Sequence, residues 1–136
     1  MSVSNIEVTS APVLVEKPWG CEEIYALVPG KFCGKVLRVR AGHALSLHYH
    51  RVKEEVISVQ AGTARLEIGD HIDELDVVAM VPGNAVHIPP GRLHRISAVS
   101  DVVLLEASTT ELDDVIRVAD RYGRETGRPS QDRSQT

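Results

Sequence analysis

Two kinds of feature are scarce or missing in this sequence: cysteine and long apolar runs. Only Cys21 and Cys33 occur among its 136 residues, and two cysteines in a chain that is not exported are typical of free thiols. No apolar run approaches the roughly 20 residues that a membrane-spanning helix needs. Residues 1–12 have neither a basic start nor an apolar stretch, so no signal peptide is visible. We therefore expect a cytoplasmic protein that does not bind membranes.

The sequence also lacks an excess of basic residues. It has 15 lysines and arginines against 19 aspartates and glutamates, which gives a formal net charge of −4. Recognition of a nucleic-acid backbone requires a basic electrostatic field. The charge balance argues against nucleic acid as a partner, and we expect a small-molecule substrate instead.

What the chain does contain is enough apolar sequence for one hydrophobic core. Its length and its hydrophobic content of 43% are typical of a single soluble domain. Residues 1–12 are polar without a clear period and predict an N-terminal arm. Residues 125–136 are polar and have no aromatic residue, so they predict a flexible tail. The folded domain is expected to cover residues 13–124.

Short strands separated by turn signals fill most of this domain. Residues 63–68 alternate between polar and apolar side chains, and Pro29-Gly30, Gly69-Asp70 and Pro82-Gly83 mark turns. Because no helical period interrupts these strands, the pattern predicts an all-β barrel or jelly roll.

The period changes after residue 109. Thr110 is placed to cap a helix with Asp113 as its capping partner, and Leu112, Val115 and Ile116 form an apolar stripe at helical spacing. The pattern predicts a short C-terminal helix that packs on the barrel.

Four residues of metal-ligand type are spaced so that a β-sheet can bring them together. His48 and His50 are two residues apart, and side chains at this spacing in a strand point to the same face. Glu55 follows after a gap that suits a hairpin turn, and His94 comes after the turn at residues 89–91. Three imidazoles and one carboxylate suit one divalent transition metal, namely Zn, Mn, Fe, Ni or Co. The alternative is that these histidines are surface or satisfied core residues of a barrel without a metal.

The spacing resembles the two motifs of the cupin superfamily. Residues 42–62 fit the first motif, Gly-x5-His-x-His-x4-Glu-x6-Gly, and residues 83–94 fit the second, Gly-x5-Pro-x-Gly-x2-His, although Ala98 stands where asparagine is usual. The resemblance implies a cupin-type double-stranded β-helix, which is a jelly-roll barrel. It also implies a metal held by His48, His50, Glu55 and His94.

Flanking segments narrow this resemblance. Residues 16–20 (EKPWG), 88–95 (IPPGRLHR) and 113–124 (DDVIRVADRYGR) are similar to the C-terminal isomerase domain of type II mannose-6-phosphate isomerases. The sequence departs from that family at His48, where glutamine is expected, and at residues 51–53, where a histidine-rich segment is expected. The resemblance implies a homodimer that interconverts an aldose and a ketose through a cis-enediol.

Such a reaction needs a base, an acid and a cation near the developing oxyanion. We predict that Glu54 and Lys53 act as the acid and base. The alternative for each residue is a solvated surface charge.

Contacts with a polar or anionic sugar are predicted from nearby cations and the single tryptophan. Arg38, Arg40 and Arg92 are candidates for clamping a phosphate or carboxylate, and Lys17 and Trp19 are candidates for the rim of the metal cavity. Arg38 and Arg40 share one face of an alternating segment, and that face points either into the barrel or to solvent. Trp19 could instead plug one end of the barrel.

Two other functions stay open. One is an Fe(II)-dependent dioxygenase, in which iron held by the same four ligands binds substrate and dioxygen, and oxygen uptake would distinguish it. The other is a cupin that binds a sugar or metabolite without catalysis. Tight binding without turnover, unaffected by metal removal, would mark this third function.

Overall fold

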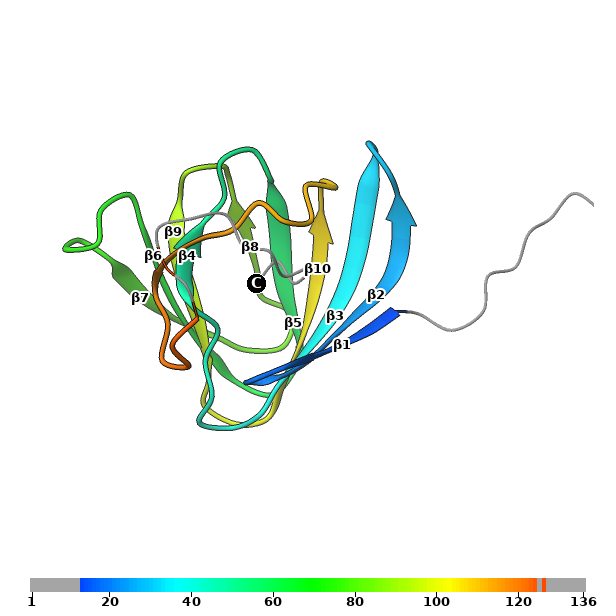
Figure 1. The fold of residues 1–136 in the computed structure, drawn as a ribbon. Helices are drawn as coiled ribbons and strands as arrows, with labels where there is room; N and C mark the ends of the chain where they lie inside the picture. The colour runs from blue at the N-terminus through cyan, green and yellow to red at the C-terminus, as the bar shows by residue number, and fades with distance from the viewer. Residues whose placement is uncertain (1–12, 125, 127–136) are drawn as a thin grey trace, which may run out of the picture.

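A computed structural model of the protein describes residues 13–124 and Thr126, and it folds them into two antiparallel β-sheets (Figure 1). The predicted arm at residues 1–12 and the predicted tail, apart from Thr126, lie outside the described residues. The strands are β1 (Val13–Lys17), β2 (Gly20–Val28), β3 (Phe32–Val39), β4 (Leu47–Tyr49), β5 (Glu55–Ala61), β6 (Ala64–Gly69), β7 (Asp76–Met80), β8 (Ala85–Ile88), β9 (Leu93–Ala98), β10 (Val102–Ser108) and β11 (Ile116–Ala119).

The two sheets form the opposite walls of a barrel. One sheet has the order β1-β2-β3-β10-β5-β8, and the other has the order β11-β4-β9-β6-β7. From β3 onward the chain passes repeatedly from one sheet to the other, as Figure 1 shows. This crossing is the jelly-roll arrangement, so the predicted all-β jelly-roll fold is confirmed.

The strands alternate because one face of each sheet is buried against the other. In β5, for example, Glu55, Ile57 and Val59 are buried, while Val56 between them is exposed. The same alternation places Leu37 of β3 and Leu104 of β10 opposite each other in the core. Burial of such side chains is the main favourable contribution to folding.

The interior is apolar toward one end and ionisable toward the other. Along β10, the buried side chains change from Leu104 to Glu106 and Ser108, and along β3 they change from Leu37 to Lys35. Antiparallel pairing brings the polar positions of the two strands into register, with Lys35 opposite Glu106. One end of the barrel is therefore a packed core, and polar side chains gather toward the other end.

The predicted C-terminal helix is wrong, because the described residues contain no helix. The hydroxyl of Thr110 accepts a hydrogen bond from the backbone N–H of Gly30 instead of capping a helix. Val115 and Ile116 are both buried, and Ile116 begins β11, which pairs with β4. Pairing with a strand distant in the sequence therefore overrides the local helical period.

Candidate metal centre

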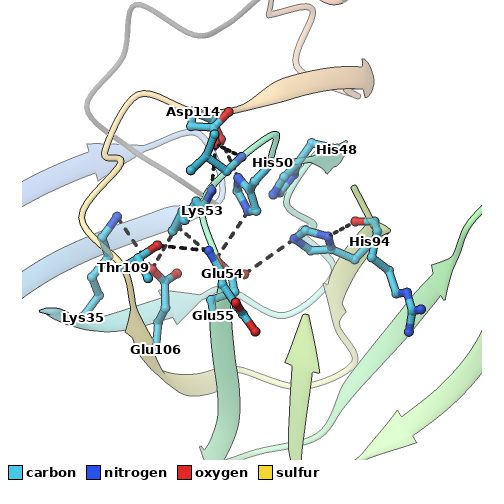
Figure 2. A network of polar contacts seen from close by, with 12 residues as sticks. Lys35, His48, His50, Lys53, Glu54, Glu55, His94, Glu106, Thr109 and Asp114 are labelled. Atoms are coloured by element: carbon cyan, nitrogen blue, oxygen red, sulfur yellow. Dashed lines mark hydrogen bonds and ion pairs between the residues drawn. The ribbon is translucent and has the colours of Figure 1, made fainter. Parts of the chain in front are cut away.

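Three histidines converge inside the barrel. His48 of β4 and His94 of β9 are directly opposite each other across the two strands, and His50 follows β4 on the same face. One ring nitrogen of each histidine lies within 4.8 Å of the corresponding nitrogens of the other two. All three side chains are buried, and Figure 2 shows their rings facing a common point.

The other ring nitrogen of each histidine is fixed by a backbone carbonyl. Nδ1 of His48 lies 3.0 Å from the carbonyl oxygen of Ser46, that of His50 lies 2.5 Å from the carbonyl of Asp114, and that of His94 lies 2.9 Å from the carbonyl of Arg92. A carbonyl only accepts hydrogen bonds, so each Nδ1 carries the hydrogen and each Nε2 keeps its lone pair.

The three Nε2 atoms are buried and have no hydrogen-bond partner in the described part of the chain. Burial lowers the pKa of His48 well below its usual value, and the neighbouring rings of His94 and His50 lower it further. A neutral imidazole with a free Nε2 lone pair is the form that binds a metal.

Glu55 adds a carboxylate to this cluster. It is the first residue of β5, and its Oε2 and Oε1 atoms lie 3.3 Å from Nε2 of His50 and 3.6 Å from Nε2 of His94. Burial alone would raise the pKa of Glu55, but the ammonium group of Lys53 holds it well below its usual value. The donor set is thus three neutral imidazoles and one ionised carboxylate, which fits a divalent transition metal.

The side chains of the two predicted acid–base residues point in opposite directions, one into the barrel and one toward solvent. Lys53 is fully buried, and its Nζ lies 2.9 Å from Glu55 and 3.0 Å from Glu106. Glu54 points away from the histidines and pairs with Nε2 of His87 at 2.5 Å, where both side chains are about half exposed. The structure therefore brings Lys53, but not Glu54, into contact with a candidate metal ligand.

The arginine face of β3 points outward. Arg38 forms an ion pair with Glu23 at 2.8 Å, and Arg40 donates a hydrogen bond to the carbonyl of Pro18. Both arginines line a cleft of about 500 Å³ on the outside of the barrel. The structure does not bring them to the histidines.

The other predicted substrate contacts are also dispersed. Arg92 is half-buried, and its Nε lies 3.3 Å from a carboxylate oxygen of Asp70. Trp19 is fully buried and belongs to the apolar core, and Lys17 is buried at the end of β1.

Sequence analysis missed Arg117, which is almost fully buried in β11. Arg117 is the direct partner of His48 across β11 and β4, and opposite residues of antiparallel strands place their side chains on the same face. The register therefore puts Arg117 on the same face of the sheet as His48. The incorrect helix prediction hid this cation, because a strand at residues 116–119 would have placed it beside β4.

Fold and site together define a β-barrel with a candidate metal centre in its interior. The family described as "Cupin domain" matches residues 35–107, and the chain belongs to this family. The resemblance to the cupin superfamily is thereby confirmed.

Two sequence relatives have names that refer to mannose 1-phosphate and to xanthan biosynthesis. "Mannose-1-phosphate guanylyltransferase" of Escherichia coli (strain K12) is 31% identical over 116 residues. "Xanthan biosynthesis protein XanB" of Xanthomonas campestris pv. campestris (strain B100) is 30% identical over 115 residues. Each alignment covers 81% of this chain but only 23% of the relative, so the chain spans about a quarter of their length.

Solved structures support the fold. The capsular polysaccharide assembling protein CapF from Staphylococcus aureus has a TM-score of 0.69 at 19% identity, over 82% of this chain and 35% of CapF. Oxalate decarboxylase from Bacillus subtilis has a TM-score of 0.70 at 16% identity, over 88% of this chain and 35% of the enzyme. The described residues of this chain form no helix able to cross a membrane.

Proposed function

We propose that this protein is a metal-dependent isomerase that interconverts the aldose and ketose forms of a small anionic sugar, with mannose 6-phosphate as the first substrate to test. The observation that carries the proposal is the convergence of three unpartnered Nε2 atoms beside the ionised Glu55. The relatives whose names refer to mannose 1-phosphate support the substrate class. A homodimer in the cytoplasm remains part of the proposal.

His48, His50, Glu55 and His94 would hold the metal ion. When bound, the ion supplies Lewis-acid polarisation of the carbonyl and neighbouring hydroxyl, which stabilises the negative charge that develops on oxygen during enolisation. The four ligands are buried, and exclusion of water strengthens electrostatic interactions with that oxygen.

Arg117 is the proposed contact for the anionic group of the substrate. It is buried on the same face of the sheet as His48, and a planar guanidinium matches a phosphate or carboxylate through paired hydrogen bonds. This assignment replaces Arg38 and Arg40 in the proposal, because both lie on the outer face.

Proton transfer between the two carbons requires a group that can accept and release a proton. Lys53 is locked between two carboxylates, which suits a fixed charge better than a group that exchanges protons. Glu54 remains the candidate base, although its side chain would have to leave His87 to reach the interior. A Glu54→Gln variant tests this role, since loss of the base is expected to lower kcat by about 10²- to 10⁴-fold.

The function is tested by incubating metal-loaded protein with mannose 6-phosphate in D₂O and following deuterium at C2 by NMR. Isomerisation through an enediol is expected to give the ketose product together with exchange at C2. Arg117→Ala is expected to raise KM for the phosphorylated sugar by at least about tenfold, from the loss of a charged hydrogen bond. Arg38→Ala is the matched control. Arg38 is on the solvent-exposed outer face of β3, so its loss should leave KM unchanged.

A second candidate is an Fe(II)-dependent dioxygenase, and the donor set of three histidines and one glutamate favours it. Four protein ligands leave positions open for a substrate and dioxygen on an ion that accepts six. Oxygen consumption by the Fe(II)-loaded protein, without deuterium exchange into mannose 6-phosphate, would support this candidate over the isomerase. Binding of the sugar with neither exchange nor oxygen uptake would support a non-catalytic role.

A further inference from the structure

A chain of buried charges leads from the candidate metal centre into the larger sheet (Figure 2). Nζ of Lys53 lies 2.9 Å from Oε2 of Glu55 and 3.0 Å from Oε2 of Glu106. Nζ of Lys35 lies 3.9 Å from the same Glu106 oxygen and 3.0 Å from Oε1 of Glu22. None of these five side chains is exposed to solvent.

The register of the strands brings these charged side chains together. Lys35 of β3 is directly opposite Glu106 of β10, and both face inward, so their side chains meet inside the barrel. Lys53 reaches the group from the segment just before β5. Its backbone N–H donates a hydrogen bond to the carboxylate of Asp114, so the position of its main chain is also fixed.

Isolated charges are costly to bury, and even a buried ion pair often contributes little to stability. Nζ of Lys53 lies between two buried carboxylates, 2.9 Å from Glu55 and 3.0 Å from Glu106, so opposite charges surround it. Its position against a candidate metal ligand suggests a role beyond packing.

The two oxygens of Glu55 have different surroundings. Oε2 lies 2.9 Å from Nζ of Lys53 and 3.3 Å from Nε2 of His50, whereas Oε1 lies 3.6 Å from Nε2 of His94. A glutamate with free rotation about its side chain could present either oxygen, or neither, to a metal. An ammonium group on Oε2 fixes the rotation of the carboxylate and keeps both of its oxygens toward the histidines.

We propose that Lys53, held in turn by Glu106, is a positioning residue that orients the carboxylate of Glu55 to bind the metal. This inference rests on the metal centre of the proposed function, but it does not depend on isomerase activity. It assigns Lys53 to the placement of a ligand instead of to acid–base catalysis.

The test compares Co(II) binding by the wild type and Lys53→Met, measured by competition with a chromophoric chelator. Removing a group that orients a metal ligand typically weakens metal affinity by about 10- to 100-fold, and we expect a loss in that range. The visible absorption spectrum of bound Co(II) is expected to change as well, because the Glu55 carboxylate is no longer held in one orientation. Lys53→Arg, which keeps a cation at this position, is expected to restore most of the affinity and the spectrum.

The matched control is the double variant Glu22→Gln/Lys35→Met, which removes a buried ion pair of the same kind one step farther from Glu55. It is expected to lower stability while leaving Co(II) affinity and spectrum near those of the wild type. If Lys53→Met does not fold, Glu106→Gln provides the test instead. This substitution removes the charge that holds Lys53 in place, so it should weaken Co(II) binding, by a smaller factor.

Wild-type affinity and spectrum in Lys53→Met, or in Glu106→Gln where only that variant folds, would overturn the inference. An equal loss in the Glu22→Gln/Lys35→Met control would also overturn it, because the effect would then follow from a general loss of buried charge. If the wild type itself binds no Co(II), the metal centre fails, and the proposed function fails with it. Binding of Co(II) with the expected pattern, but without isomerase activity, would uphold the role of Lys53 and reject only the proposed reaction.

Discussion

The backbone carbonyl of Asp114 lies 2.5 Å from Nδ1 of His50, so a residue 64 positions along the chain orients a candidate metal ligand. The carboxylate of Asp114 accepts hydrogen bonds from the backbone N–H groups of Arg51, Val52 and Lys53 at 3.0, 2.6 and 2.9 Å. One residue therefore fixes both the imidazole of His50 and the segment that joins it to Glu55.

Replacing this aspartate should destabilise the fold. Asp114→Ala removes the acceptor for three backbone N–H groups, and hydrogen bonds to a charged group contribute about 1.5 to 3 kcal/mol each. Because the carboxylate is only partly buried, we expect a total loss of about 2 to 4 kcal/mol in the free energy of unfolding, measured by urea denaturation of the metal-free protein. The neighbouring Asp113 is exposed, so Asp113→Ala should change stability by less than about 0.5 kcal/mol. Equal effects of the two substitutions would contradict the role given to Asp114.

Two glycines distinguish the cost of a positive φ angle from the cost of a steric clash. Gly42 and Gly62 have positive φ angles of 80° and 82°, which a residue with a Cβ atom adopts only at a cost of about 1 to 2 kcal/mol. A Cβ on Gly42 would meet no atom within 4 Å, whereas one on Gly62 would lie 2.0 Å from the carbonyl oxygen of Asp101. Gly42→Ala should therefore cost about 1 kcal/mol, and Gly62→Ala should cost several times more by thermal or urea denaturation. Similar losses for both variants would show that the close approach to Asp101 is absent.

Glu67 and Arg95 should give stability a dependence on pH. Two nitrogens of Arg95 lie 3.0 and 3.1 Å from the oxygens of Glu67, and this pair holds the pKa of Glu67 below its usual 4.5 even though burial acts in the opposite direction. Because the folded-state pKa is lowered, the ion pair stabilises the protein fully above about pH 4.5, and that stabilisation is lost as the pH falls through the folded-state pKa.

The expected size of this contribution is about 1 kcal/mol. Glu67→Gln should lower stability at pH 7 and reduce the slope of stability against pH between about pH 5 and pH 3. Urea denaturation at a series of pH values measures both. An unchanged slope in the variant would show that the Glu67–Arg95 pair is not formed in solution.

The grouping of the four candidate ligands could be predicted from the strand period and from the motif spacing. His48 and His50 share a face because side chains two residues apart in a strand point the same way. The motif spacing identified Glu55 and His94 as the other two ligands. The structure brings these four side chains together, with Nε2 of each histidine and a carboxylate of Glu55 within reach of one another.

The surroundings of the cluster depend on pairings that are distant in sequence. Alternation divided residues 34–41 into two faces but could not say which face is inside. Lys35 shares the buried face with Leu37, and its partners there are Glu22 of β2 and Glu106 of β10, both distant in sequence. Arg117 was missed for the same reason, since its place beside His48 follows from the pairing of β11 with β4.

The most direct test of the metal centre is elemental analysis of the purified protein and of two histidine variants, after anaerobic reconstitution with Zn, Mn, Fe, Ni or Co. We predict about one metal ion per wild-type chain, loss of that metal in His94→Ala, and retention in His87→Ala, because His87 lies on the exposed outer side with Glu54. A wild-type protein that retains none of these metals, or a His94→Ala variant that retains as much as the wild type, would contradict the metal centre.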